Sequence, residues 1–321
     1  MAQYQSDVEA VDALKESYQK LTAEIGKVII GQDETVKMLL TAIFCQGHCL
    51  LVGVPGLAKT LLIQTIAGAL DLDFNRIQFT PDLMPSDIVG SETLDNERNF
   101  RFVKGPIFAN IILADEINRT PPKTQSALLE AMQEYSVTVA GKKYPLEKPF
   151  FVLATQNPIE QEGTYPLPEA QLDRFMFMVT LDYPSYKAEL DIVKSTTSDK
   201  RYEVKQQVTG EQILAFQQLV RRVPVADNVV EYAVKLVHKT RPNTDMADAT
   251  SNKYLEWGAG PRASQNLVLA AKCNALLNGK YSPDIEDVKA VAMAVLRHRI
   301  VRNFKAEAEG VSVEDIVKKL M

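Results

Sequence analysis

The stretch Gly53-Val54-Pro55-Gly56-Leu57-Ala58-Lys59-Thr60 decides the fold of this chain. It follows a short apolar run at residues 48–52 and opens a segment with helical spacing at residues 60–70. Backbone N–H groups at such a turn and at a helix N-terminus form a concave anion site. Lys59 adds a positive charge for the β and γ phosphates of a nucleotide, and Thr60 offers a hydroxyl to Mg²⁺. The segment therefore predicts a phosphate-binding loop between a strand and a helix.

One position of this loop departs from the usual pattern, because Ala58 stands where the consensus has glycine. The loop must therefore tolerate a methyl group there. A chance turn of glycine and proline before a helix is the alternative, which the lysine and threonine at the end of the loop disfavour. We expect a nucleotide to contact residues 53–60 and Leu61, which follows them.

A second apolar run, residues 111–114, ends in two carboxylates, Asp115 and Glu116. Open α/β sheets bind ligands at the carboxyl ends of their strands. Adjacent strand residues point to opposite sides, so we assign Asp115 to Mg²⁺, through its water shell, and Glu116 to the attacking water. Two solvated acids at a strand end are the alternative, which the upstream phosphate-binding loop disfavours.

The pattern of apolar residues divides the chain into two parts. Strands are predicted at residues 48–52, 76–79, 111–114, 150–154 and 175–181. Helices are predicted at residues 8–25, 33–44, 60–70 and 123–134, and a β-hairpin at residues 136–146. After residue 184 only helices are predicted, at residues 187–195, 210–222, 227–238, 263–277 and 285–299. We therefore expect an α/β nucleotide-binding domain with a parallel sheet at residues 1–184 and a smaller all-α domain at residues 185–321.

The composition limits the partners and the compartment. A net charge of −5, from 36 basic and 41 acidic residues, creates no global field that attracts nucleic acid. No run approaches the roughly 20 apolar residues of a membrane span. Three cysteines suit a reducing compartment, so a cytoplasmic location is expected. Cys45, His48 and Cys49 are too few for a closed zinc site, so core packing is the favoured interpretation.

Three further segments resemble parts of AAA+ ATPases. Residues 151–158, Phe-Val-Leu-Ala-Thr-Gln-Asn-Pro, resemble the strand of the first sensor. Residues 167–175 resemble the segment that ends in the arginine finger of MoxR-like and magnesium-chelatase-like proteins, and residues 260–264 resemble the second sensor. The resemblance implies that Asn157 orients the lytic water, that Arg174 reaches the ATP of a neighbouring subunit, and that Arg262 lies near the phosphates.

Each of these residues has a simpler explanation. Asn157 precedes a proline and suits a turn, Arg174 could pair with Asp173 or Glu169, and Pro261 suits a plain helix start. Residues 28–32 resemble the family segment that passes the adenine ring, which implies contacts from Ile30, Gly31 and Gln32, although an ordinary loop explains them nearly as well. Arg119 is either an interface arginine or a surface residue.

Nearly the whole chain resembles the MoxR family. Residues 85–106 resemble an insert in the second core helix. The conjunction of three segments is specific to MoxR-like proteins: Gly-Val-Pro-Gly-Leu-Ala-Lys-Thr, Ala-Asp-Glu-Ile-Asn-Arg-Thr-Pro-Pro-Lys and Ala-Thr-Gln-Asn-Pro. The resemblance implies an ATPase that needs Mg²⁺ and works as a ring homo-oligomer, expected to be a hexamer. It also implies chaperone-like remodelling or maturation of protein partners, which in this family often contain a von Willebrand factor A domain.

Two other functions compete with this interpretation. A nucleic-acid motor of the same architecture would need basic and aromatic residues in its hairpins, and candidates occur at Lys142, Lys143, Tyr144, Arg98, Phe100, Arg101 and Phe102. The net charge disfavours such a partner, and a solvated hairpin explains these residues as well. A small-molecule kinase would leave the arginine-finger segment unexplained.

Overall fold

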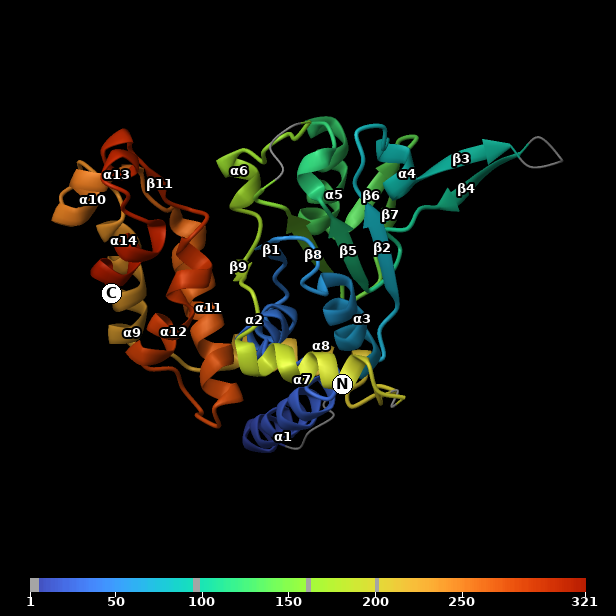
Figure 1. Cartoon of the computed structure of the whole chain (residues 1–321), viewed down its shortest axis with the longest axis horizontal. Coiled ribbons are helices and arrows are strands. Elements are labelled where there is room, and N and C mark those ends of the chain that lie inside the picture. Colours follow the sequence, from blue (N-terminus) through green and yellow to red (C-terminus); the bar gives the residue numbers. More distant parts are fainter. Residues whose placement is uncertain (1–5, 95–98, 160–162, 200–201) are drawn as a thin grey trace.

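A parallel sheet of five strands forms the centre of the computed structural model, which describes residues 6–94, 99–159, 163–199 and 202–321 (Figure 1). The strand order is β2-β5-β8-β1-β9. The strands are β1 (Cys49–Gly53), β2 (Phe74–Gln78), β5 (Ile111–Asp115), β8 (Phe151–Gln156) and β9 (Phe177–Leu181). All five predicted strands are present, each with its ends within two residues of the predicted ones.

Helices cover both faces of this sheet, which explains its continuous apolar runs. Ile111 and Leu113 of β5 pack with one set of helices, and Ile112 and Ala114 pack with another on the opposite face. The first set consists of α1 (Asp7–Ile25), α2 (Asp33–Phe44) and α3 (Lys59–Ala69), and the second face carries α5 (Pro122–Glu134). These four helices were predicted within one residue at each end.

The predicted insert is a β-hairpin that projects from the sheet domain (Figure 1). The short helix α4 (Pro85–Val89) leads into the two hairpin strands, β3 (Gly90–Leu94) and β4 (Phe100–Lys104). Gly90 has φ +93°, and a Cβ there would lie 2.1 Å from the Val103 carbonyl oxygen. The base of the hairpin therefore requires glycine at this position. Arg98, considered above for nucleic-acid binding, lies outside the described residues.

The predicted β-hairpin, β6 (Ser136–Val139) and β7 (Lys142–Pro145), lies beside the hairpin of the insert. Its turn residues Ala140 and Gly141 have φ +48° and +79°, as a two-residue hairpin turn requires. The Tyr144 ring stacks on Phe102 of β4, with centroids 4.0 Å apart. The two hairpins are therefore joined by an aromatic contact.

The carboxyl-terminal part is helical, and its described residues form the five predicted helices and three shorter ones that were not predicted. The helices there are α7 (Tyr186–Thr196), α8 (Gly210–Arg222), α9 (Asp227–Lys239), α10 (Ala249–Tyr254), α11 (Pro261–Leu277), α12 (Ile285–Leu296), α13 (Phe304–Ala308) and α14 (Val313–Leu320). An unpredicted antiparallel ribbon, β10 (Leu255–Trp257) and β11 (Val301–Arg302), also occurs there, so this part is not purely α-helical. Among the described residues, we find no helix with the length and apolar character that a membrane crossing requires.

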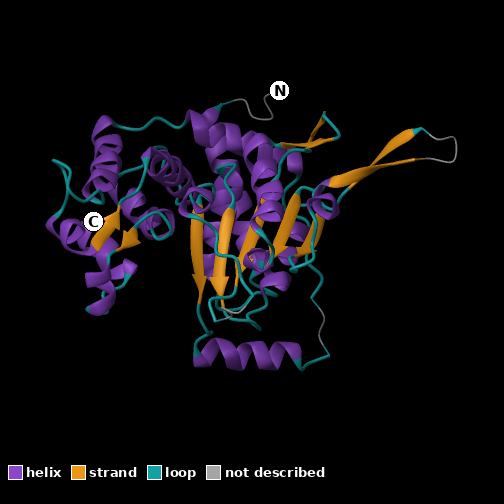
Figure 2. Ribbon diagram, turned by 90° about the horizontal axis from the view of Figure 1, so that it is seen from above, coloured by secondary structure: helices purple, strands orange, loops and turns teal. Residues whose placement is uncertain are grey.

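These helices occupy two places relative to the sheet. Helix α7 lies beyond the carboxyl ends of the strands, as Figure 2 shows, and α8 packs on α1 and α2. Helices α9 to α14 form a separate group beside β9, which we call the lid (Figure 1). The domain boundary after residue 184 stays a prediction.

Candidate nucleotide-binding site

The loop after β1 is shaped as a cradle at the carboxyl edge of the sheet. Gly56 and Ala58 have φ +86° and +54°, which turns the chain back before α3 begins at Lys59. A Cβ added at Gly56 would meet no atom within 4 Å, so the space beside the loop is open. The first N–H groups of a helix lack intrahelical partners and attract anions. The cradle therefore fits the phosphates of a nucleotide.

Lys59 lies between this loop and the two acids. Its ammonium donates to the Gly53 carbonyl oxygen. Burial lowers the pKa of Lys59, while the charges of Asp115 and Glu116 raise it. The structure therefore brings the predicted phosphate-binding lysine and both predicted acids together.

The first acid, Asp115, is held by two side chains from neighbouring strands. Thr155 of β8 donates its hydroxyl to Oδ1 at 2.7 Å. Arg76 of β2 donates to Oδ2 from Nη2 at 2.6 Å and from Nε at 3.1 Å. Both carboxylate oxygens thus have partners, which is consistent with a metal held through its water shell rather than directly.

The second acid, Glu116, has a left-handed backbone with φ +58°, and its N–H donates to the Thr155 hydroxyl at 2.9 Å. Its Oε2 accepts from Gln78 at 3.1 Å and pairs with Arg119 at 3.3 Å. Arg119 therefore has a partner within its own chain.

Arg76, Gln78 and Thr155 were missed by the sequence analysis. They are ordinary strand residues in sequence, and only the strand order β2-β5-β8 places them beside the acids.

Asn157 follows β8 at the same edge of the sheet. Its side chain is buried, and Oδ1 accepts the N–H of Ile159 at 3.2 Å, which is the local turn contact considered above. Because Val52 and Gln156 are paired across β1 and β8, Asn157 lies beside the end of the strand that leads into the cradle.

A cavity of about 350 Å³ lies next to the loop, where Val28 and Leu61 face the end of α7. Gly31 contacts α7 so closely that a Cβ there would lie 2.7 Å from the Ala188 Cβ. Gln32 donates to the Leu57 carbonyl oxygen at 3.5 Å, and its buried Oε1 has no partner among the described residues. Val28 and Leu61 give this cavity an apolar wall, and Ser195, Thr196, Ser198 and Asp199 give it a polar one. A purine base, which has apolar faces and polar ring edges, fits such a mixed lining.

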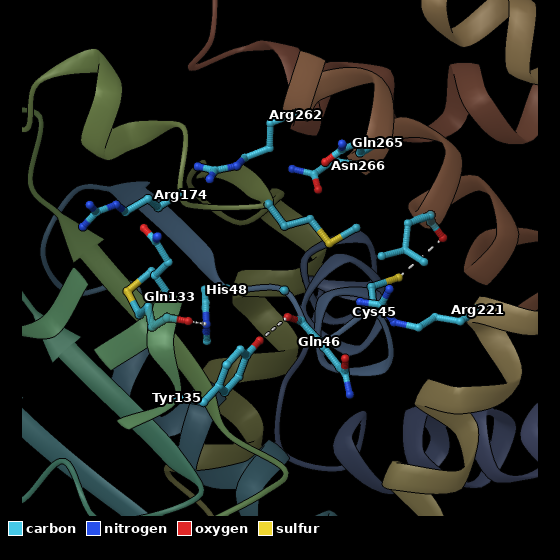
Figure 3. Close-up of a pocket in the computed structure, with 14 residues that line it drawn as sticks. Cys45, Gln46, His48, Gln133, Tyr135, Arg174, Arg221, Arg262, Gln265 and Asn266 are labelled. Atoms are coloured by element: carbon cyan, nitrogen blue, oxygen red, sulfur yellow. Dashed lines mark hydrogen bonds between the residues drawn. The ribbon is translucent and has the colours of Figure 1, made fainter. Parts of the chain in front are cut away.

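The two remaining predicted residues, Arg174 and Arg262, lie at the amino ends of the sheet strands, which we call the opposite edge of the sheet. Arg174 precedes β9, whose first residue Phe177 is paired with Cys49, the first residue of β1. Lys59 lies at the other end of β1, where it donates to the carbonyl oxygen of the last strand residue, Gly53. A five-residue strand spans roughly 13 Å. Both arginines line a cavity of about 230 Å³, shown in Figure 3. Arg221 lines it too, and no acidic side chain is among the described residues around it.

Within its own chain, Arg262 therefore lies away from the phosphate-binding loop, and its action near the phosphates of a nucleotide stays a prediction. Helix α11 begins beside the segment before β9, and Arg262 pairs there with Asp173 at 3.3 Å. The helical pattern predicted α11 correctly, but it held no information about which edge of the sheet this helix adjoins. The simpler explanation of Arg174 was an ion pair with Asp173 or Glu169. The structure describes both acids, and Arg174 pairs with neither; Asp173 pairs with Arg262 and Arg299 instead.

His48 has a structural role, as the core-packing interpretation predicted. Its Nδ1 accepts the Val152 N–H at 3.1 Å, and its Nε2 bonds to the Met132 carbonyl oxygen at 3.1 Å. Cys45 and Cys49 are buried free thiols. The described part of the chain contains no group of three or more side chains that could hold a metal ion through His, Cys, Asp or Glu.

Comparison with known proteins agrees with this architecture. The model of the ATPase family associated with various cellular activities matches residues 48–177, and the AAA lid domain matches residues 247–320. Chaperone MoxR1 of Mycobacterium tuberculosis is 42% identical over 299 residues, which are 93% of this chain and 79% of that protein. Protein MoxR of Methylorubrum extorquens is 30% identical over 86% of this chain and 85% of its own length.

The chain belongs to the MoxR family of AAA+ ATPases. Another relative of this MoxR-family chain is protein YeaC of Bacillus subtilis, 42% identical over 94% of this chain and 92% of that protein. A crystal structure of a candidate ATPase from Cytophaga hutchinsonii has a TM-score of 0.91 at 44% identity, covering 97% of this chain and 95% of that one. The predicted family and the predicted fold, an AAA+ α/β domain followed by a helical lid, are confirmed.

Proposed function

We propose that this MoxR-family ATPase hydrolyses ATP in a closed ring of identical subunits, in which Arg174 of one subunit completes the site of the next. The observation that carries the proposal is the placement of Lys59 and Arg174 at opposite edges of one sheet. A single chain cannot bring these two groups to one phosphate. Head-to-tail contact between neighbours would bring one edge against the other, and a hexamer is the ring size that the family suggests.

In this proposal each residue has a defined task. The loop N–H groups and Lys59 bind the phosphates, and Thr60 and Asp115 hold Mg²⁺. Glu116 accepts a proton from the attacking water, which Asn157 orients. Bound Mg²⁺ supplies positive charge that stabilises phosphoryl transfer.

The neighbour contributes the arginines of the opposite edge. Arg174 stabilises the charge that develops on the transferred group, a task that needs a guanidinium without a competing carboxylate. Arg262 lines the same cavity and pairs with Asp173, so we infer that it faces the neighbouring nucleotide rather than its own, in a supporting role beside Arg174.

We further propose that the hydrolytic cycle remodels a protein partner. In some cases this partner would contain a von Willebrand factor A domain. The relative named Chaperone MoxR1 supports this class of function. The two hairpins are the projecting elements that such a partner would meet. Their aromatic residues Phe102 and Tyr144 stack on each other, and Lys142 pairs with Glu92 at 3.5 Å. Phe102 and Tyr144 are therefore already in contact with each other, whereas Phe100 of the same insert is exposed. The nucleic-acid motor is therefore tested directly, by adding DNA.

The test is ATP hydrolysis per subunit across a protein dilution series, with and without single-stranded DNA. We expect activity per subunit to rise with concentration, to ignore DNA and to be lost in Arg174→Ala. Arg222→Ala is the matched control, because Arg222 is exposed and pairs with Asp7 on the surface. Activity that does not depend on concentration and survives Arg174→Ala would refute the shared site. Stimulation by DNA would instead support the nucleic-acid motor.

A further inference from the structure

A buried arginine of the lid holds the backbone on both sides of Arg174. Arg299 follows α12, and its side chain is 1% exposed. Its Nε donates to Asp173 Oδ1 at 2.7 Å, and its Nη2 donates to the carbonyl oxygens of Asp173 and Phe175 at 3.1 and 2.6 Å. Its Nη1 donates to the Met176 carbonyl oxygen at 3.2 Å and to that of Val295. All five donors of the guanidinium are used, and four of them bind residues 173–176.

Neighbouring lid residues bind the same segment. His298 donates from Nε2 to the Phe175 carbonyl oxygen at 3.0 Å, and Arg262 pairs with the second oxygen of Asp173 at 3.3 Å. Burial keeps the pKa of His298 well below its usual value, so this ring stays neutral. The carboxylate beside Arg174 is thus shared by two lid arginines.

Packing alone does not explain a charged residue in this place. Burying a guanidinium is costly unless its charge and donors are matched, and an apolar side chain would join two helical layers at lower cost. The bonds of Arg299 instead fix the carbonyl groups of the residues that flank Arg174. A displacement of about 1 Å at a catalytic group can lower a rate about 100-fold, so such fixing affects catalysis.

We propose that Arg299 is a positioning residue for Arg174, and that through it the lid sets how the finger of one subunit meets the nucleotide of the next. The inference rests on the proposed function, because it requires Arg174 to act on a neighbour. Movement of the lid would then change hydrolysis in the adjacent subunit, since the finger segment is bound to residues of the lid.

Mixed rings test this inference. Lys59→Ala subunits lack the phosphate lysine and contribute only fingers, whereas Arg174→Ala subunits contribute only hydrolytic sites. Each variant alone should be inactive, and the mixture should recover activity where a site meets a finger. An inactive mixture would overturn the shared site itself, and the inference with it.

Arg299→Lys is then added to one partner at a time. In the finger-contributing subunit it should lower the kcat of the mixture about 10-fold or more, with the KM for ATP unchanged, because ATP binds to the other subunit. In the site-contributing subunit it should change kcat less than about twofold. An equal loss of kcat with the substitution in either subunit would mean that Arg299 has a purely structural role. No loss of kcat in either case would mean that it has no role. Both results would overturn the inference.

Two further variants separate an effect on Arg174 from a general loss of folding. Asp173→Asn keeps the backbone carbonyl groups and removes the charge that pairs with Arg299 and Arg262, so it should give the same asymmetry with a smaller loss. Arg302→Lys is the matched control, because Arg302 donates to the Val311 carbonyl oxygen within the lid at 3.0 Å. It should leave the mixture active in either subunit. A loss for Arg302→Lys equal to that for Arg299→Lys in the finger-contributing subunit would overturn the inference.

Discussion

Acid should weaken the fold through His48, which can be tested by replacing it with glutamine. The ring is buried, accepts one hydrogen bond through Nδ1 and bonds to a carbonyl oxygen through Nε2. A protonated ring could not accept the bond from Val152. Burial lowers the pKa of His48 from 6.5 to about 4. A glutamine side chain also has one acceptor and one donor group, but it does not titrate.

The sign and size of the effect follow from linkage. The pKa of His48 in the folded state lies below that in the unfolded state, so the unfolded chain binds the proton first as the pH falls. The stability that His48 contributes is complete above about pH 6.5 and is lost as the pH falls toward about 4. Each pKa unit corresponds to about 1.4 kcal/mol, so the free energy of unfolding should fall by about 3 kcal/mol over this window.

Urea unfolding followed by circular dichroism measures this effect. The wild type and His48→Gln are compared at about pH 7 and about pH 4, and the wild type should lose about 3 kcal/mol more than the variant. His298, whose pKa burial also lowers, titrates in both proteins and cancels in the comparison. Parallel losses in the two proteins would show that His48 takes up its proton equally in both states and would refute the reasoning.

Three further outcomes follow from the site and the insert. Glu116→Gln should bind a fluorescent ATP analogue normally, while steady-state turnover falls about 100-fold or more because the base is lost; full turnover would remove the assignment. Ala58→Gly should raise the free energy of unfolding by roughly 0.5–1 kcal/mol, because φ +54° strains alanine, and Ala67→Gly inside α3 should lower it in the same urea titration. Gly90→Ala should lower the thermal midpoint far more than Gly141→Ala, since both have positive φ but only Gly90 lies against a backbone oxygen; equal shifts would contradict this steric argument.

Features of the fold that depend on local sequence were predictable. The phosphate-binding loop lies in one continuous segment, and β5 delivers Asp115 and Glu116 at its own end, so neither required knowledge of the topology. The turn at Ala140-Gly141 was also a local signal. Lys59 and the two acids could therefore be assigned together from the sequence.

Features that depend on how distant segments meet were not predictable. Arg76 reaches Asp115 only because β2 is paired with β5. Arg262 begins a helix that the apolar pattern predicted well, yet the pattern cannot say where the lid packs. Arg299 was the last residue of a predicted helix and carried no signal that it would bind residues 173–176.

The proposed action of Arg174 on a neighbour's nucleotide restricts the symmetry that an active assembly can have. A two-fold axis makes the same patch of both partners meet, and no single patch contains both edges, so a symmetric dimer would have no complete site. Translation-like stacking that fails to close would give a filament with one fewer complete site than it has subunits. Only a closed ring gives every subunit a complete site. In such a ring, a subunit without Lys59 would inactivate its own site, and a subunit without Arg174 would inactivate the site of one neighbour. A subunit without both residues would inactivate two sites.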